Sequence, residues 1–350
     1  MAIPTVDEMI SEMESGPPVY LPTNIWTVLL PLHMQMLEKF GIERFKLSVN
    51  RHYGMSDVIR HSHGEWKGIT DFLGTSSPEH LMATTEHPMT ETESFLFDTN
   101  DDVHIYRNYV CMLWDICLRL DKDGLCDLVS EPEFGSPIYI SYQGRRITQD
   151  LAKSVLDAIA VRERLPALAS GSSLIAEIGP GYGRLAHVLA QTSNCRYAFF
   201  DIPPALYVAQ SYFEHLYPGQ VAPFRRYRSH GELAQAIEGK RFMFFTANQL
   251  ALFPDQSFDA MINIDSFGEM EPETVRTYVA HMSRQTRAGG GLYMRNIGTG
   301  SMFKGRVWEV AGAEDYTPKG NGLDETWTAE PARNWPMDPR YVERVFVRER

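Results

Sequence analysis

The 350-residue sequence has little cysteine, fewer basic than acidic residues and no long apolar run. Its four cysteines are too few and too scattered for a disulfide framework, and no two of them form a CxxC metal pair. No segment approaches the ~18 consecutive apolar residues that a membrane-spanning helix requires. The acidic N-terminus lacks the basic region of a signal peptide. These absences predict a cytoplasmic protein without a membrane partner.

Basic residues are also too scarce for a broad basic surface. The chain has 33 Lys and Arg against 45 Asp and Glu, which gives a formal net charge of −12. This balance argues against nucleic acid as a partner. The tightest basic cluster, Arg225-Arg226-Tyr227-Arg228, is short, and we expect a solvated turn there rather than a phosphate site. The remaining composition, with 43% hydrophobic residues, is that of an ordinary globular protein of one large or two modest domains.

The pattern along the chain changes near residue 165. Before it, apolar residues recur at helical spacing over 25–37 and 105–120, with a short strand or hairpin at 136–144 and a helix over 147–161 that Thr148 caps. After it, strands alternate with helices. The expected strands are 174–178, 196–200, 241–245, 258–264 and 291–295, and the expected helices are 185–190, 205–216 and 272–286. Apolar strands separated by helices predict a parallel sheet covered on both faces. We therefore expect a mostly helical domain at 1–164 and a doubly wound, Rossmann-like α/β domain at 165–350.

The most informative motif is the run Glu177-Ile-Gly-Pro-Gly-Tyr-Gly183, between a predicted strand and a predicted helix. Glycines there let the backbone turn tightly and approach a ligand closely. A dinucleotide fingerprint GxGxxG would need glycine at 184, where the chain has Arg184. A carboxylate at 177 has no obvious use beside an anionic pyrophosphate, whereas it suits a cationic ligand. The motif therefore disfavours an NAD-dependent oxidoreductase.

At each marked position, this motif resembles the first motif of the class I S-adenosylmethionine (SAM)-dependent methyltransferases. The resemblance implies that SAM lies across the glycine loop, with Glu177 near its methionine end or ordering the loop. Asp201 ends the next predicted strand, where a carboxylate can accept hydrogen bonds from ribose hydroxyls. NAD sites use the same device, so only the combination of Glu177, three glycines and Asp201 favours SAM.

The resemblance also directs attention to polar residues outside the loop. Asn248 or Gln249, after the third strand, can serve the adenine amine, although an ordinary polar loop is an equal alternative. Gln149 can touch SAM or simply occupy the first turn of a helix. The full set of expected cofactor contacts is Gln149, Glu177, Gly179, Pro180, Gly181, Gly183, Asp201, Ile202, Asn248, Gln249 and Asn263.

Candidate catalytic residues follow the fourth predicted strand. A neutral hydroxyl is a poor nucleophile, so a base within hydrogen-bond reach helps it to accept a methyl group. Asp265 and Glu269 are placed to act as this base or to bind substrate hydroxyls. Glu269 has an alternative role near the N-terminus of the next helix, where an acidic residue is favourable. His52 is a further candidate base, because histidine titrates near neutrality.

Several longer segments resemble one branch of the family, the sugar O-methyltransferases of bacterial natural-product gene clusters. They are 44–53, 131–137, 144–154, 179–183, 200–203 and 263–270. This resemblance implies methyl transfer to a hydroxyl of a sugar or a glycosylated small molecule. The alternatives are a methyltransferase of a non-sugar hydroxyl or amine, and a SAM-binding protein that transfers no methyl group.

Neither a metal nor an oligomeric state follows from the sequence. The pair His61 and His63 has no specific ligand spacing, so no metal site is expected. The helical domain at 1–164 can cap the site and bind the acceptor, or it can form the interface of a homodimer.

Overall fold

The computed structural model describes residues 6–23, 25–46, 73–74, 100–298, 301–303, 306–308, 311–318, 326–336 and 338–349. The chain forms two compact units. One unit contains residues 1–30, 161–335 and 340–350, and the other contains residues 31–160 and 336–339. The first unit is therefore discontinuous in sequence, and it includes the N-terminus.

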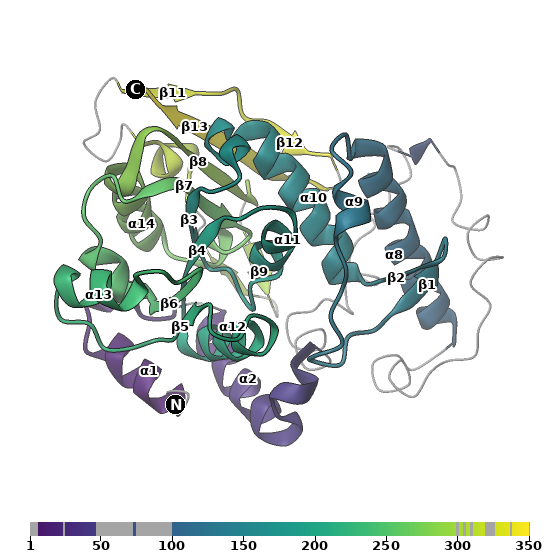
Figure 1. The fold of residues 1–350 in the computed structure, drawn as a ribbon, viewed down its shortest axis with the longest axis horizontal. Coiled ribbons are helices and arrows are strands. Elements are labelled where there is room, and N and C mark those ends of the chain that lie inside the picture. The colour runs from purple at the N-terminus through teal and green to yellow at the C-terminus, as the bar shows by residue number, and fades with distance from the viewer. Residues whose placement is uncertain are drawn as a thin grey trace. The chain divides into compact units, whose positions relative to one another are not determined.

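The unit with the N-terminus is built on a mixed sheet dominated by parallel strands (Figure 1). Its strand order is β11-β13-β8-β7-β3-β4-β6-β5, with β12 paired to β13. The parallel part has the order of a doubly wound sheet, with β3 in the centre between β4 and β7. This order confirms the expected Rossmann-like fold class. The strands are β3 (Leu174–Ile178), β4 (Arg196–Asp201), β5 (Val221–Ala222), β6 (Phe242–Thr246), β7 (Phe258–Ile264), β8 (Thr286–Ile297), β11 (Trp327–Ala329), β12 (Arg333–Trp335) and β13 (Asp338–Arg348).

Helices connect the parallel strands, because parallel neighbours need a crossover. They are α11 (Arg184–Thr192), α12 (Pro203–Leu216), α13 (His230–Ile237) and α14 (Pro272–Gln285), with the short 3-10 turns η3 (Pro166–Ser170), η4 (Ala247–Leu252), η5 (Phe267–Glu269) and η6 (Ala313–Tyr316). Among the described residues no helix is long and apolar enough to cross a membrane. The four cysteines are buried and form no disulfides.

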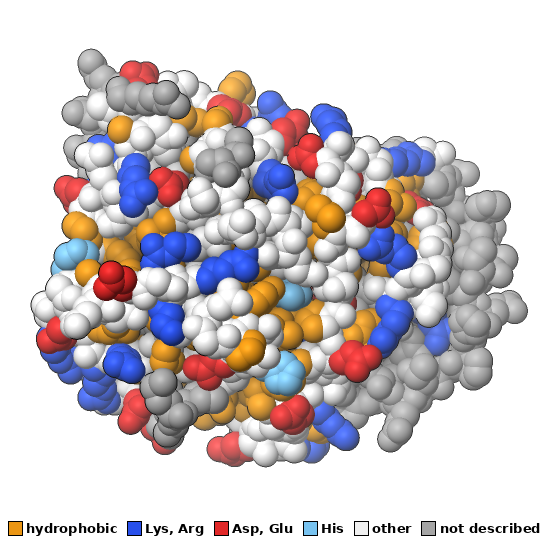
Figure 2. Space-filling model, in the orientation of Figure 1, with side chains coloured by type: hydrophobic (Ala, Val, Ile, Leu, Met, Phe, Trp, Pro, Cys, Tyr) orange, Lys and Arg blue, Asp and Glu red, His pale blue; other side chains and the backbone are white. Residues whose placement is uncertain are grey.

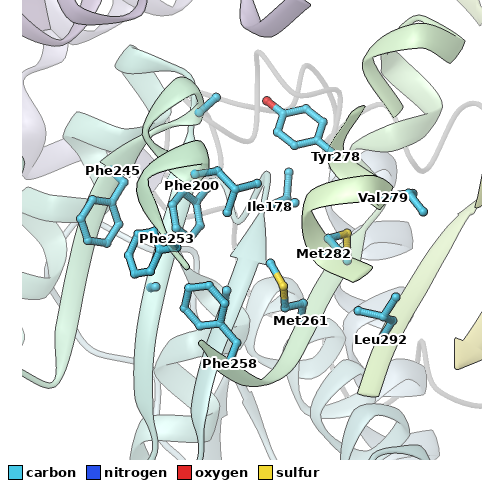
Figure 3. Packing of buried hydrophobic residues seen from close by; sticks show 14 of the residues in the cluster. Ile178, Phe200, Phe245, Phe253, Phe258, Met261, Tyr278, Val279, Met282 and Leu292 are labelled. Carbon is cyan, nitrogen blue, oxygen red and sulfur yellow. The ribbon is translucent and has the colours of Figure 1, made fainter. Parts of the chain in front are cut away.

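Both faces of the sheet are packed with aromatic side chains. Consecutive strand residues point to opposite faces, so Phe199 stacks on Phe244, with ring centroids 4.4 Å apart, while Phe200 stacks on Phe245 at 5.2 Å. The second face belongs to a core that includes Tyr278, Val279 and Met282 of α14 (Figure 3). The run of apolar residues in β4 follows from this burial on both sides.

The C-terminal strands were not predicted. β13 runs antiparallel to β8, with Phe346 opposite Leu292, and β11 runs antiparallel to β13. This edge of the sheet mixes polar with apolar positions. For example, Glu343 and Arg295 are paired across it. Such a pattern gives a weaker signal than the apolar runs of β3 and β7.

The first thirty residues belong to the sheet unit, although the expected domain boundary lay at 165. α1 (Val6–Glu14) packs on α12 and β6, and η1 (Pro18–Tyr20) packs on α14. Glu12 of α1 is buried and pairs with Arg228 at 3.4 Å. Part of the basic cluster at 225–228 therefore fastens the N-terminal helix. On the face shown in Figure 2, Lys and Arg side chains are interspersed with Asp and Glu.

The other unit is largely helical, as expected. Its main elements are α2 (Trp26–Phe40, which begins in the first unit), η2 (Ile42–Arg44), α8 (Asn100–Leu120), α9 (Leu125–Leu128), the hairpin of β1 (Ile140–Tyr142) with β2 (Arg145–Ile147), and α10 (Gln149–Arg164), whose end lies in the first unit. The Thr148 hydroxyl accepts a hydrogen bond from Leu151 N at 3.0 Å, which confirms its capping role. The same hydroxyl donates to Glu131, which forms a buried ion pair with Lys46. In the unit with the N-terminus, but outside its main sheet, β9 (Ser301–Phe303) pairs with β10 (Arg306–Trp308).

Candidate functional site

The glycine motif forms a tight loop between β3 and α11. All three glycines have positive φ angles, between +59° and +84°. Gly179 donates its N–H to the Phe200 carbonyl oxygen at 2.9 Å, and a Cβ at this position would overlap the Ser266 side chain. A Cβ at Gly183 would lie 2.6 Å from the Phe199 ring and 2.7 Å from the Phe213 ring. Both glycines are therefore required by close packing as well as by backbone conformation.

Gly181 differs from the other two glycines because a Cβ there would meet no atom within 4 Å. Its N–H donates to Asp201 Oδ2 at 2.8 Å, which ties the loop to the end of β4. The other oxygen, Oδ1, accepts a hydrogen bond from Ile202 N at 2.7 Å. Burial raises the pKa of Asp201 to about 7, against the lowering effect of these two hydrogen bonds. Asp201 thus holds a fixed orientation beside an open stretch of glycine backbone.

Glu177 lies within β3, two residues before the loop. It is 4% exposed, and its Oε2 accepts a hydrogen bond from the Tyr197 hydroxyl at 2.5 Å. Tyr197 belongs to β4, so this bond joins the two central strands on one face of the sheet. The contact holds the Glu177 carboxylate between the two strands.

A buried amide network lies beneath the loop. Asn263, at 0% exposure, donates to the Ile178 carbonyl at 2.9 Å and to Ser266 Oγ at 2.5 Å. Its oxygen accepts a hydrogen bond from Asn296 Nδ2 at 2.8 Å, and Asn296 Oδ1 accepts from Phe267 N at 2.9 Å. Asn263, expected among the cofactor contacts, is thus engaged in joining β3, β7 and β8. Ser266 and Asn296 were missed, because polar residues after strands do not reveal their partners in sequence.

Asp265 follows β7 with a φ of +66°, a conformation that is rare outside glycine. Its backbone N–H bonds to the Arg295 carbonyl at 2.8 Å, and its carboxylate pairs with Arg295 Nη2 at 3.2 Å. The Arg295 guanidinium stacks over the Trp335 ring at 4.3 Å. This strained backbone, fixed from β8, presents a half-exposed carboxylate at the end of β7.

Glu269 ends η5, four residues after Asp265. Its Oε2 accepts a hydrogen bond from the Trp26 indole nitrogen at 2.8 Å. The residue as a whole is half-buried, but desolvation of its carboxyl group raises the pKa to about 7. The Trp26 bond lowers this pKa, and the charges of Asp265 and Asp201 raise it further. Asp201 and Asp265 therefore act electrostatically on Glu269, and we call the three residues the carboxylate trio.

The two residues expected near an adenine are held by other parts of the protein. Gln249 is 1% exposed, accepts from Thr246 N at 3.2 Å and donates to the Arg225 carbonyl at 2.8 Å. Asn248 donates to the Glu12 carbonyl at 3.3 Å. Its side-chain oxygen is buried and has no hydrogen-bond partner among the described residues. Of the two, Asn248 retains an acceptor for a ligand.

The remaining predicted residues lie apart from this unit or outside the described residues. Gln149 opens α10 in the other unit and is 2% exposed. His52, His61 and His63 lie outside the described residues. Within the described part of the chain, no group of three or more His, Cys, Asp or Glu side chains is arranged to hold a metal ion.

The site as a whole lies at the carboxyl ends of β3, β4 and β7. In a doubly wound sheet, ligands bind at this edge where the strand order reverses, which here is around β3. Arg295 compensates Asp265, so Asp201 and Glu269 supply the excess negative charge when ionised. The arrangement can hold hydroxyl groups of a ligand, favour a cation and accept a proton near neutral pH.

Of the known proteins compared with this chain, only solved structures are similar to it. No family model matches the chain, and no curated protein matches it significantly. Magnesium protoporphyrin IX methyltransferase of Synechocystis is 15% identical, over 72% of this chain and 98% of its own, with a TM-score of 0.38. The 1,6-didemethyltoxoflavin-N1-methyltransferase of Burkholderia thailandensis is 14% identical, over 58% and 79%, with a TM-score of 0.35. Because both scores are below 0.5, the fold assignment rests on the strand order.

Proposed function

We propose that this protein is a SAM-dependent O-methyltransferase that acts on a small hydroxylated molecule. The observation that carries the proposal is the arrangement of Asp201, whose carboxylate is fixed by Gly181 N–H and Ile202 N–H beside the glycine loop. Each carboxylate oxygen can accept a second hydrogen bond, so the group can hold two ribose hydroxyls without moving. Gly181 leaves room for the ligand above the backbone.

The electrostatics of the trio favour SAM over a phosphate-bearing dinucleotide. SAM carries a sulfonium and an ammonium group, whereas NAD carries an anionic pyrophosphate. Above pH 7 both Asp201 and Glu269 are increasingly ionised, because their pKa values lie at about 7. A cation beside them stabilises the ionised carboxylates, which burial disfavours.

The chemistry needs little from the protein beyond placement and a base. When bound, SAM supplies a methyl group whose carbon–sulfur bond breaks as the acceptor oxygen bonds to carbon. Glu269 accepts the proton of the acceptor hydroxyl, for which a pKa near the working pH is suited. Asp265, fixed by Arg295, orients the acceptor hydroxyl. Positioning and exclusion of water supply most of the remaining rate enhancement.

The acceptor class that we propose is a sugar or a glycosylated small molecule. The support is the resemblance of the segments at 44–53, 131–137 and 144–154 to sugar O-methyltransferases. In the structure, part of these segments meets in the contact of Lys46, Glu131 and Thr148 within one unit.

The first experiment is isothermal titration of the protein with S-adenosylhomocysteine (SAH). We expect micromolar binding that Asp201→Ala weakens by about tenfold or more, since hydrogen bonds to charged groups contribute ~1.5–3 kcal/mol. Asp255→Ala, which removes an exposed carboxylate paired with Arg284, is the matched control and should bind as the wild type does. Absence of binding to the wild-type protein would refute the proposal.

A transfer assay then separates the enzyme from a protein that binds SAM without transferring its methyl group. We expect methyl-labelled SAM to label one or more compounds in a panel of glycosides. Glu269→Gln should reduce this labelling at least a hundredfold, within the range that a general base contributes. SAH binding without labelling of any hydroxylated acceptor would favour the binding-only alternative.

A further inference from the structure

The indole of Trp26 reaches the candidate base from a distant part of the chain. Trp26 is the first residue of α2, and its Nε1–H donates to Glu269 Oε2 at 2.8 Å, across 243 residues of sequence. Both residues belong to the same unit. This is a connection to the site that neither the glycine motif nor the strand ends predict.

The segment that precedes Trp26 is fastened to the sheet unit by several contacts. The Val19 carbonyl accepts a hydrogen bond from Thr274 Oγ1 at 3.2 Å. The Tyr20 ring packs edge-on against Tyr278 at 5.7 Å, and its hydroxyl is hydrogen-bonded to His281 Nε2 at 2.8 Å. Tyr20 itself is 5% exposed. None of these contacts involves Glu269, so the packing of Val19 and Tyr20 does not depend on the bond between Trp26 and Glu269.

An indole donor has a different effect from a cationic partner. The indole N–H is neutral, so it orients the carboxylate and stabilises its charge without cancelling that charge. Among the described residues, the charged groups that act on Glu269 are Asp265 at the end of β7 and Asp201 at the end of β4. Asp265 already has a cationic partner in Arg295, whereas Glu269 has the indole. The negative charge of Glu269 thus remains available to a ligand.

We propose that Trp26 is a positioning residue of the site, whose indole N–H holds the Glu269 carboxylate in its charged form toward a cationic cofactor. The inference rests on the proposed function for the identity of the cation. It adds Trp26, from the N-terminal part of the chain, to the residues of the site. Trp26→Phe is the discriminating variant, because it retains an aromatic ring and removes the donor.

The first test needs no ligand. The chain has six tryptophans, so its indole 1H–15N resonances are few, and the one missing in Trp26→Phe identifies Trp26. We expect this resonance to shift with pH around a midpoint near 7, where Glu269 titrates. In Glu269→Gln the shift should be absent, whereas in Asp201→Asn it should remain with a lower midpoint. A Trp26 resonance indifferent to Glu269→Gln would overturn the proposal.

The second test compares the affinities of SAM and SAH, which differ by the methyl group and the sulfonium charge. In the wild type we expect the preference for SAM to rise severalfold between pH 6 and pH 8 as Glu269 ionises. Trp26→Phe should move this rise to a higher pH by about one unit, since the lost bond stabilised the charged form. In Glu269→Gln the rise should be smaller, because only the titration of Asp201 over the same range remains to cause it.

The outcomes separate this inference from the proposed function. If neither ligand binds the wild type, the proposed function fails, while the resonance of Trp26 still reports on its bond to Glu269. If both ligands bind and Trp26→Phe weakens them equally at every pH, Trp26 has only a structural role and the inference is wrong. Further, Trp26→Phe should have little effect on the SAM preference in a protein that already carries Glu269→Gln.

Discussion

At the residue scale, the glycine loop contains a position, Gly183, where the Cβ of an alanine would collide with neighbouring side chains. At Gly183, a φ of +84° combines with a Cβ position 2.6 Å from Phe199 and 2.7 Å from Phe213. We expect Gly183→Ala to destabilise the protein by about 2–5 kcal/mol, as the sum of left-handed strain and overpacking. Urea unfolding followed by circular dichroism measures this change.

Gly219 provides the matched control for that variant. Its φ is +81°, but a Cβ there would meet nothing within 4 Å. Gly219→Ala should therefore cost only the backbone strain, about 1–2 kcal/mol. Equal losses in the two variants would show that the aromatic packing around Gly183 contributes nothing.

Asp201 gives the stability a specific dependence on pH. Burial raises its pKa from 3.8 to about 7 in the folded state, so between these values the native protein binds more protons than the unfolded chain. Stability from this group is therefore complete below pH 3.8 and is lost as the pH rises through 7. In the ligand-free protein, Asp201→Asn should gain stability relative to wild type between pH 5 and pH 8, by up to a few kcal/mol. Thermal unfolding across this range tests the slope; a parallel decline in the two proteins would refute it.

At the element scale, the predictable parts are those whose signal is local. The mostly apolar runs of β3 and β7 predict the bounds of these strands correctly, because a strand buried on both faces consists largely of apolar residues. The loop after β3 and the carboxylate at the end of β4 follow from motif and spacing. Trp26 and Asn296 could not be found in this way, since their roles arise from contacts with Glu269 and Asn263 that only the folded chain creates.

The N-terminal helix α1 illustrates the same limit. The sequence of this helix does not indicate the surface on which it packs. Glu12 is buried beside Arg228 and Arg226, with oxygen–nitrogen distances of 3.4 and 4.0 Å. The Glu12 carbonyl also accepts a hydrogen bond from Asn248. The basic cluster and the loop after β6 thus form part of the surface on which α1 packs.

We expect Glu12→Ala to loosen α1 without unfolding the sheet. Its arginine partners are largely exposed, so the loss of global stability should be small, about 1 kcal/mol or less. Amide hydrogen exchange over 6–20 should accelerate at least fivefold, because local opening needs less free energy than global unfolding. Asp7→Ala, which removes an exposed carboxylate of the same helix, is the control and should leave the exchange unchanged.

At the scale of the whole molecule, the sheet unit is assembled from three separate parts of the chain. Residues 1–30 join 161–335 and 340–350 in one compact unit. Met9, Met13 and Tyr20 from the first part are each at most 5% exposed. A cut at residue 165, where the sequence pattern changes, would therefore remove buried side chains from the unit that it was meant to isolate.

We accordingly expect the fragment 165–350 to lose cooperative folding, although it contains the whole parallel sheet and the glycine loop. Large core side chains contribute ~2–5 kcal/mol each, and a domain is stable by only ~5–15 kcal/mol in total, so the absence of Met9, Met13 and Tyr20 is enough to unfold it. Thermal unfolding followed by near-ultraviolet circular dichroism measures this directly. Co-expression with a fragment covering 1–164 is the complementary arm, and should restore a sharp transition and SAH binding. A fragment 165–350 that melts as cooperatively as the full chain would show that the N-terminal segment is dispensable, and Trp26 could then not be needed to hold Glu269 in place.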